Sequence, residues 1–169
     1  MKKYLFYARS MILNFVYFHT LSKRIVFGKN VKIDGRVFLG KKIVLDDNVE
    51  LRNHTKEKLI VGSNTSINRN TVVRGKVNIG DNVSIAPNCM IVGANHKFDN
   101  LSLNIKDQGY ENKGIHIENN VWVGANCCIL DGTVIGTGSV IGAGSIVTKS
   151  IPPMSIAVGN PCKVIKRRF

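Results

Sequence analysis

The sequence is short of the residue patterns that bind metals or form disulfides. Its four cysteines include no CxxC pair, and its four histidines include no two that are spaced closely enough to share one metal ion on adjacent turns. The cysteines are Cys89, Cys127, Cys128 and Cys162, and the histidines are His19, His54, His96 and His116. These absences predict that the protein has no metal site. They also predict that it works in a reducing cytoplasm.

No uninterrupted apolar run reaches the roughly 20 residues that a membrane-spanning helix needs. The opening segment MKKYLFYARSMILNFVYFHTLSKR begins like a secretion signal, but Arg9 and Asn14 interrupt it and no A-x-A-like cleavage site follows. Its apolar residues fall on one side of a helical wheel. Two interpretations of residues 1–24 are open: a helical or irregular cap that closes one end of the domain, or an interfacial segment that rests on anionic lipid at the inner membrane surface.

Acidic residues are also scarce, with 11 Asp and Glu against 24 Lys and Arg, which gives a formal net charge of +13. Such a charge favours a polyanionic partner, which could be nucleic acid, an anionic membrane or a phosphorylated small molecule. The sequence shows no recognition helix and no patch of interleaved basic and aromatic residues. We therefore do not expect nucleic acid to be the partner.

Aliphatic or aromatic residues recur at every sixth position over most of the chain after residue 26. The three runs are Phe27, Ile33, Leu39, Leu45 and Leu51; then Val61, Ile67, Val73, Ile79, Ile85 and Ile91; then Ile117, Val123, Ile129, Ile135, Ile141 and Val147. A second small or branched residue comes four positions later, as Val31 does after Phe27. Gly, Asn and Asp occupy many of the positions between them.

A period of six fits neither a helix of 3.6 residues per turn nor a simple alternating hairpin. It fits short extended stretches separated by tight turns, with Gly, Asn or Asp at the corners. Three hexads make one triangular coil, so the seventeen hexads predict an all-β fold, a parallel β-helix of nearly six coils over residues 27–153. Residues 1–26 precede it, and Pro152 and Pro153 are expected to end the last coil before a basic tail over 154–169. A β-sandwich with coincidental spacing is the alternative that these phase-locked runs disfavour.

The six-residue count breaks twice. Four extra residues lie between Leu51 and Val61, and a longer break runs from Ile91 to Ile117. An insertion in a solenoid must leave the stack as a loop, and loops on a rigid scaffold often carry chemistry. The second insertion, residues 93–114, contains His96 close to the preceding coil. His96 is thus the candidate functional residue, although an isolated histidine in a polar loop is often only solvated.

The segment from Ile79 to Arg168 resembles the hexapeptide-repeat acyltransferases, most closely the galactoside/maltose O-acetyltransferase branch. The likeness rests on the loop histidine, on "NVWVG", on "GAGSIVTK" and on the ending "IPP…GNPCKVI". It implies a left-handed β-helix and a homotrimer with active sites between subunits. It also implies acetyl-CoA as the acyl donor and transfer of the acetyl group to a hydroxyl.

The resemblance assigns roles to individual residues. His96 matches the general base, which would let a hydroxyl attack the thioester directly, without an acyl-enzyme. Backbone N–H groups around Gly124 and Ala125 match the position that faces the thioester. The remaining residues that match the cofactor site are Ala143 and Gly144 beside the pantetheine arm, Thr148 and Lys149 near its outer end, and Lys163 and Lys166 at the phosphates.

Departures from the family pattern concern the acceptor. Ser66 and Arg74 fall near the positions of an Asn and an Asp that bind sugar in galactoside-type enzymes. Trp122 matches the family tryptophan of "NVW", and either lines the site or packs on the inserted loop. Because Arg74 replaces an acid, we expect an anionic glycan or a lipid-linked precursor, such as one used for cell-surface polysaccharide.

Other activities are possible on the same architecture. The acceptor could instead be an antibiotic, a serine hydroxyl or an amino-sugar amine. A γ-type carbonic anhydrase would need three metal-binding histidines, and the histidine spacing disfavours it. A non-catalytic β-helix that only binds a partner would need neither His96 nor the run from Ala143 to Lys149.

Overall fold

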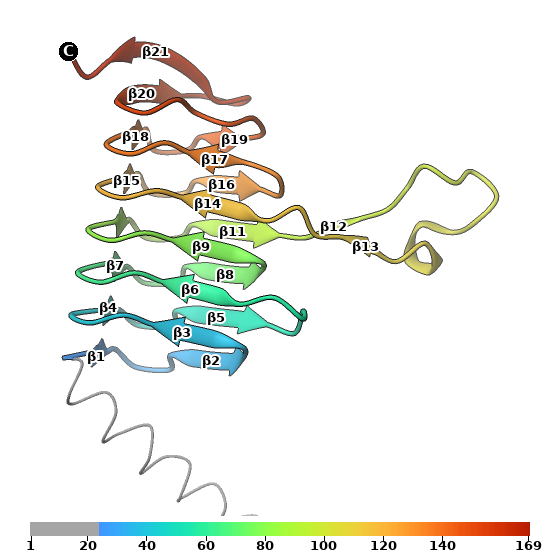
Figure 1. Cartoon of the computed structure of the whole chain (residues 1–169), viewed down its shortest axis with the longest axis horizontal. Helices are drawn as coiled ribbons and strands as arrows, with labels where there is room; N and C mark the ends of the chain where they lie inside the picture. The colour runs from blue at the N-terminus through green and yellow to red at the C-terminus, as the bar shows by residue number, and fades with distance from the viewer. Residues whose placement is uncertain (1–23) are drawn as a thin grey trace, which may run out of the picture.

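The computed structural model describes residues 24–169, which fold into a parallel β-helix of stacked coils (Figure 1). Apart from residues 24–26, the predicted N-terminal cap or membrane segment lies outside the described residues. The single helix among residues 24–169 is a short 3-10 turn, η1 (Ile105–Asp107). This turn is not long and apolar enough to cross a membrane, and the described residues contain no other helix.

Three parallel sheets form the three faces of the stack, and we name them A, B and C in the order in which the chain visits them. Sheet A contains β1 (Val26–Phe27), β4 (Val44–Leu45), β7 (Ser66–Ile67), β10 (Ser84–Ile85), β15 (Trp122–Val123), β18 (Val140–Ile141) and β20 (Ser155–Val158), with β21 (Lys163–Arg167) added antiparallel at the end. Sheet B contains β2 (Lys32–Gly35), β5 (Glu50–Asn53), β8 (Val72–Gly75), β11 (Met90–Gly93), β16 (Cys128–Leu130) and β19 (Ile146–Val147). Sheet C contains β3 (Val37–Leu39), β6 (Leu59–Val61), β9 (Val77–Ile79), β14 (Ile115–Ile117) and β17 (Val134–Ile135). The predicted β-helix is thus confirmed.

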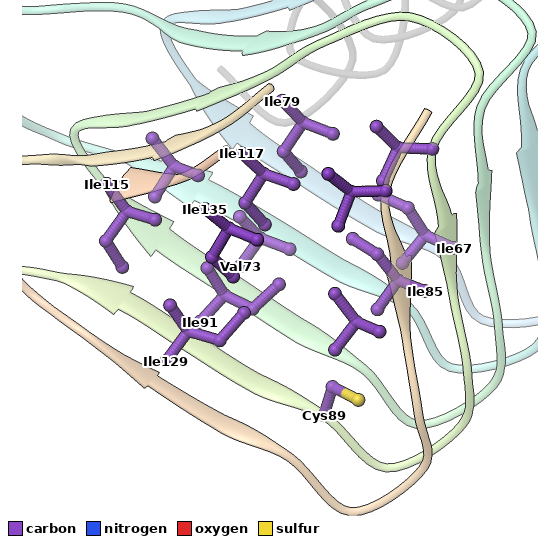
Figure 2. Close-up of a cluster of buried hydrophobic side chains, with 14 of the residues drawn as sticks. Ile67, Val73, Ile79, Ile85, Cys89, Ile91, Ile115, Ile117, Ile129 and Ile135 are labelled. Carbon is purple, nitrogen blue, oxygen red and sulfur yellow. The ribbon is translucent and has the colours of Figure 1, made fainter. Parts of the chain in front are cut away.

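The hexad residues from Leu45 onwards form the core, as the period of six predicts, whereas Phe27 and Ile33 at the start of the stack are exposed and Leu39 is half-buried. In sheet A, Leu45 pairs with Ile67, Ile67 with Ile85, and the register continues upwards through Val123 and Ile141. All five of these side chains are fully buried. Figure 2 shows such side chains from all three sheets meeting inside the triangle. Burying one of them contributes about 1.5–3 kcal/mol, so the stacked column supplies much of the stability that no single coil could provide.

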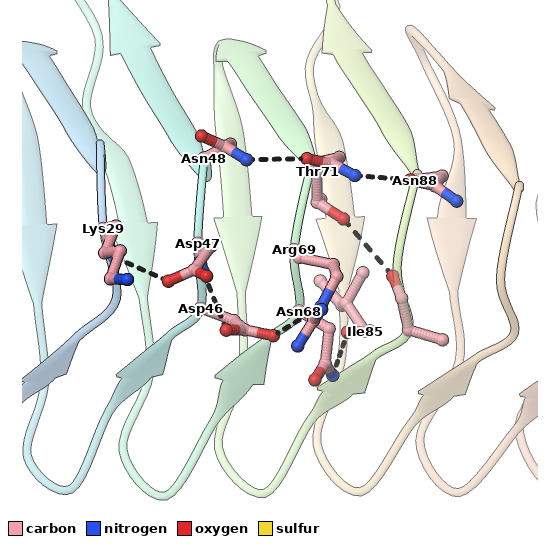
Figure 3. A network of polar contacts seen from close by, with 11 residues as sticks. Lys29, Asp46, Asp47, Asn48, Asn68, Arg69, Thr71, Ile85 and Asn88 are labelled. Atoms are coloured by element: carbon pink, nitrogen blue, oxygen red, sulfur yellow. Dashed lines mark hydrogen bonds and ion pairs between the residues drawn. The ribbon is translucent and has the colours of Figure 1, made fainter.

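Asparagines hold the corners of the coils. Their backbones adopt the left-handed conformation, with φ of 59° at Asn48, 58° at Asn70 and 61° at Asn88. Asn tolerates this conformation better than other residues with a side chain, and its amide both donates and accepts hydrogen bonds. Asn48 donates to Asn70 at 3.0 Å, and Asn70 donates to Asn88 at 3.1 Å (Figure 3). The corner between sheets A and B therefore carries a ladder of amides that ties successive coils together.

The stack extends beyond residue 153, where the sequence predicted the last coil to end. Pro152 and Pro153 lie in a corner, and the ladder resumes when Met154 donates its N–H to Thr137 at 2.8 Å. β20 then pairs with β18, with Ala157 opposite Ile141. Ala157 comes sixteen residues after Ile141, two fewer than three hexads, so the six-residue count does not reveal this seventh layer of sheet A. Most of the predicted basic tail is part of the sheet.

Candidate active site

The longer insertion leaves the stack where sheet B meets sheet C. β11 ends at Gly93, the chain runs out and back through the short antiparallel pair β12 (Asn95–His96) and β13 (Tyr110–Glu111), and it re-enters the stack at β14. Figure 1 shows this loop projecting well beyond the sheets. The shorter insertion, between β5 and β6, leaves from the same corner two coils earlier. Both interruptions of the count are thus gathered along one edge of the molecule.

His96 lies in the antiparallel neck of the loop and is exposed. It is paired with Tyr110, and the two ring centroids are 4.3 Å apart with an interplanar angle of 40°. Tyr110 therefore fixes the imidazole from one side. Sequence reasoning missed this residue because its position beside His96 depends on the antiparallel pairing within the loop. Two of the three acidic residues of the loop are engaged elsewhere: Asp107 accepts from Asn104, and Glu111 pairs with Lys113.

The return of the loop to the stack is anchored by Asp131. Its carboxylate accepts hydrogen bonds from the backbone N–H of Lys113 at 3.0 Å and from that of Gly114 at 2.6 Å. Gly132 adds a backbone hydrogen bond to the carbonyl of Gly114 at 2.9 Å. Gly114 has a φ of 98°, which favours glycine, and a Cβ there would contact the side chain of Lys76. These contacts hold the returning strand of the neck, which pairs with the strand that carries His96.

We expect Asp131→Ala to loosen the loop, because two N–H groups lose their charged acceptor. The expected loss of unfolding free energy is about 1–3 kcal/mol, and protease cleavage between residues 94 and 113 should become faster. Thermal unfolding and limited proteolysis measure these effects. Asp99→Ala removes an acid from the same loop and serves as the control. Equal cleavage rates in the Asp131→Ala and Asp99→Ala proteins would show that Asp131 does not anchor the loop.

The outer part of the loop has a fixed shape of its own. The side chain of Gln108 donates to the carbonyls of Asn100 and Leu103 at 2.9 and 3.1 Å and accepts from the N–H of Asn100 at 3.0 Å. Around this centre the apolar side chains point outwards, with Phe98 65% exposed and Leu101 97% exposed. Apolar groups held in water on an ordered loop are typical of a surface that contacts another molecule.

The structure brings together the four residues that were predicted to lie beside the thioester and the pantetheine. Gly124 and Ala125 follow β15, while Ala143 and Gly144 follow β18, so the two pairs lie on successive coils at the corner between sheets A and B. We call these four residues the donor corner. Gly144 donates its N–H to the carbonyl of Ala125 at 2.8 Å. A Cβ on Gly124 would come within 2.6 Å of the backbone nitrogen of Ala143, so the two coils are in close contact there.

The hydrogen-bonding groups at the donor corner differ in part from the sequence-based assignment. The N–H of Gly124 donates to the carbonyl of Ile141 at 2.8 Å within the ladder, so it does not face outwards. Near the start of the chain the N–H of Lys29 donates to the side chain of Asp47 in the next coil at 2.6 Å (Figure 3). The residues that correspond to Ala125 and Ala143 in the next layer are Ala143 and Gly159, and neither has a side-chain acceptor. The N–H groups of Ala125 and Ala143 consequently donate no hydrogen bond to the described residues and remain available to a ligand.

Gly144 interrupts the asparagine ladder of this corner. Asparagine occupies the corresponding position in the five preceding coils, at Asn30, Asn48, Asn70, Asn88 and Asn126. Gly144 has a φ of 72°, a conformation that those asparagines also adopt, and a Cβ built on it would meet nothing within 4 Å. The backbone geometry therefore does not by itself demand glycine. What glycine provides is an edge without a side chain, along which a long ligand can lie against the main chain.

The other predicted cofactor residues lie at the end of the stack that carries β20 and β21. Thr148 and Lys149 are exposed after β19, at the far edge of sheet B. Lys163 and Lys166 are exposed on β21, where Lys163 pairs with Val158. Val158 packs on Gly142, the residue just before Ala143. The structure thus places Lys163 close to the donor corner and the remaining three side chains further from it.

His96 and the donor corner lie at opposite edges of sheet B within one chain. β11 begins near the corner of the asparagine ladder and ends at the neck of the loop. The five residues from 89 to 93 span roughly 15 Å at the rise of an extended strand. A single chain therefore does not bring the predicted base to the predicted donor site.

The predicted acceptor residues are divided between two faces. Ser66 and Trp122 point outwards from sheet A, where Ser84 lies between them and its hydroxyl is 3.3 Å from that of Ser66. Trp122 is 56% exposed and lines a pocket of about 390 Å³ with Asn82 and Ser84, away from the loop of its own chain.

Arg74 lies instead on the outward face of sheet B, opposite Val92 in the strand that leads into the loop. Its guanidinium donates twice to Glu50, at 2.9 and 2.5 Å, and this interaction holds the pKa of the Glu50 carboxyl below its usual value. Of the predicted acceptor residues, Arg74 is therefore the one close to the base of the loop.

The cysteines do not provide an activated nucleophile. Cys89 and Cys127 are both buried in the core and are therefore closed to a substrate. Their mutual hydrogen bond raises the pKa of Cys89 and lowers the pKa of Cys127 to about 7. Burial also raises the pKa of Cys128 and of Cys162. Among residues 24–169, no three His, Cys, Asp or Glu side chains are grouped so that they could hold a metal ion.

Comparison with known proteins relates this arrangement to a large group of transferases. The family described as "Bacterial transferase hexapeptide (six repeats)" matches residues 114–149. The solved structure of a maltose O-acetyltransferase from Clostridium difficile is 34% identical, with 84% of this chain and 70% of that chain covered and a TM-score of 0.59. A galactoside acetyltransferase solved in complex with coenzyme A is 36% identical, with 85% of this chain and 65% of that chain covered and a TM-score of 0.60.

The curated relatives are longer than this chain. A "Probable acetyltransferase" of Mycobacterium tuberculosis is 34% identical over 158 residues, which cover 89% of this chain. The match spans 52% of that relative, and the matches of higher identity span about a third of theirs.

Proposed function

Because the chain belongs to the hexapeptide-repeat acyltransferases, in the branch of the galactoside and maltose O-acetyltransferases, we propose that it transfers an acetyl group from acetyl-CoA to a sugar hydroxyl. The observation that carries this proposal is the donor corner, a main-chain edge with no side chain larger than a methyl group that offers two unpaired N–H groups. Acetyl-CoA needs an open main-chain edge beside its pantetheine arm. It also needs N–H donors for the oxyanion that forms when its thioester is attacked.

In this proposal His96 is the general base. A sugar hydroxyl is a weak nucleophile near neutral pH, and an imidazole can accept its proton as the oxygen attacks the acetyl carbon. The negative charge then develops on the thioester oxygen, where the N–H groups of Ala125 and Ala143 can stabilise it. The tetrahedral intermediate collapses by releasing the thiolate of coenzyme A, which takes up a proton. No acyl-enzyme is required.

The same proposal requires more than one copy of the chain. His96 and the donor corner of one chain are separated by the width of sheet B, so a complete site combines His96 of one subunit with the donor corner of a neighbour. The exposed apolar side chains of the loop, such as Phe98 and Leu101, would be covered when the loop reaches that neighbour. A homotrimer would complete the site and cover the apolar side chains of the loop. Its closed symmetry repeats one interface, which gives three identical sites.

Thiol release from acetyl-CoA tests the proposed activity. The assay uses a panel of neutral sugars, sugar phosphates, uronic acids and sugar nucleotides, with mass spectrometry to identify an acetylated product. We expect release to depend on at least one sugar and the product to carry one added acetyl ester. An amine acceptor would give an amide instead, which resists mild alkaline hydrolysis. If no sugar stimulates release, the proposed function is wrong.

A further inference from the structure

A pocket on sheet C lies outside the donor corner and outside the face that carries Trp122. It has a volume of about 270 Å³ and opens over three neighbouring outward-facing residues, Ile60, Asn78 and His116. Its rim comes from the shorter insertion, through Lys56, Glu57 and Lys58, and from Lys76 beside the neck of the longer loop. The two insertions of the β-helix thus meet at this pocket.

Positively charged side chains predominate in the pocket. Three lysines line it, with His116 on its floor and Glu57 as the one acid among its lining residues. None of the three ammonium groups forms an ion pair with a described residue. Lys58 instead lies over the ring of Phe38, with its Nζ 4.8 Å from the ring centroid. Positive charges held together without an anionic partner favour the binding of an anion.

The shorter insertion is held in place by a buried asparagine. Asn53 is 1% exposed, and its amide donates to the carbonyl of Glu57 at 2.8 Å and accepts from the N–H of Thr55 at 3.0 Å. Arg36 donates to the carbonyl of Lys56 at 2.6 Å from the other side. The backbone that presents Lys56 and Lys58 is therefore ordered before any ligand arrives, which lowers the entropic cost of binding.

Lys76 connects the pocket to the neck of the loop that carries His96. Its N–H donates to the carbonyl of Gly93, its carbonyl accepts from Ile115, and its side-chain carbons pack beneath Gly114. Gly93 and Gly114 are the two points at which the loop leaves and rejoins the stack. His96 lies three residues beyond Gly93, a span of roughly 10 Å in extended chain. A sugar held by its charged group in the pocket would therefore lie within reach of the neck that carries His96.

We propose that this pocket binds the anionic group of the acceptor, a phosphate or carboxylate attached to a sugar. The proposal rests on the proposed function, since it names the class of acceptor for the same site. Within one chain the pocket is separate from the residues expected to bind the phosphates of coenzyme A. Lys163 lies near the donor corner on the end layer of sheet A, whereas the pocket spans β6, β9 and β14 of sheet C.

Calorimetric binding of three sugars to the full chain, without acetyl-CoA, tests the proposal. The probes are glucose 6-phosphate, glucuronate and glucose. We expect the phosphate or the carboxylate sugar, or both, to bind roughly tenfold or more tightly than glucose, because charge-assisted hydrogen bonds add to those of the ring. The two charged probes distinguish a phosphate from a carboxylate as the group that is recognised.

Matched variants decide whether the pocket is responsible. The double variant Lys58→Gln/Lys76→Gln removes two charges but keeps the carbons that pack beneath Gly114, and it should bind all three sugars equally. The single variant Lys56→Gln removes only one of the three lysine charges and should show a smaller loss. Lys29→Gln/Lys41→Gln removes the same charge from other corners and should bind as the wild type does. Equal binding of charged and neutral sugars by the wild type, or an equal loss in both double variants, would overturn the proposal.

The binding result and the activity result can be told apart. Preferential binding of charged sugars that the pocket variants abolish supports the pocket even if the thiol-release assay detects no transfer, and that combination would reject only the proposed activity. Acetylation of neutral sugars by a protein that shows no preference in binding would reject only the pocket.

Discussion

His96→Ala is expected to lower the rate of acetyl transfer roughly 100- to 10,000-fold, since a positioned general base contributes about that much. The imidazole is exposed at the neck of the loop and held beside Tyr110, so its removal should leave the stack intact. The loss should fall on kcat, with little change in the KM for acetyl-CoA, because His96 does not line the donor corner. Steady-state kinetics of thiol release, with the acceptor that the sugar panel identifies, measure both quantities.

Two further variants serve as controls for this prediction. Tyr110→Phe keeps an aromatic ring next to the imidazole and should retain most of the activity. His54→Ala removes a different exposed histidine, in the shorter insertion, and should have no effect on kcat. A His96→Ala protein whose rate stays within a few-fold of the wild type would rule out its role as the base.

Gly144→Asn should abolish the use of acetyl-CoA while preserving the fold. Asparagine already adopts the required φ at Asn88 and Asn126 in the same corner, so the backbone should tolerate the change. Its side chain would occupy the open edge along which the pantetheine arm is expected to lie. We expect kcat/KM for acetyl-CoA to fall on the order of 100-fold or more, equivalent to about 3 kcal/mol of lost binding to the transition state. Thermal unfolding should be unchanged within about 0.5 kcal/mol.

Mixing the two inactive proteins provides a sharper readout. If His96 of one subunit works with the donor corner of its neighbour, refolding equal amounts of His96→Ala and Gly144→Asn chains together should regenerate roughly a quarter of the wild-type activity, because each site draws its two halves independently. Mixing without refolding provides the control. If co-refolded material remains inactive although mixed oligomers form, the site does not combine these two residues across an interface. A Gly144→Asn protein with wild-type kinetics would exclude the open edge as the cofactor site.

The fold could be predicted from the sequence because the sequence repeats every six residues. An inward-facing aliphatic at every sixth position leaves few alternatives to a stack of triangular coils, because each coil buries its apolar side chains only against its neighbours. Extra residues inserted into this spacing must leave the stack as a loop. The count alone therefore located both insertions, drew attention to His96 and placed Ala125 and Ala143 at equivalent positions in successive coils. The same count failed at Ala157, where a coil shorter by two residues continued the stack out of phase.

Contacts that depend on hydrogen-bond partners and on the course of the loop came only from the tertiary structure. Periodicity states which residues are stacked, but it does not state that the N–H of Gly124 is used by the ladder while those of Ala125 and Ala143 are not. It does not place Tyr110 beside His96, because that contact arises from an antiparallel pair inside an aperiodic insertion. Nor does it bring Lys58 and Lys76 to one pocket, since each belongs to a different coil and their approach depends on the path of the shorter insertion. The repeat thus determined the scaffold, because its stability comes from identical local units. The site was decided by side chains that depart from the repeat, whose neighbours are set only when the coils are stacked.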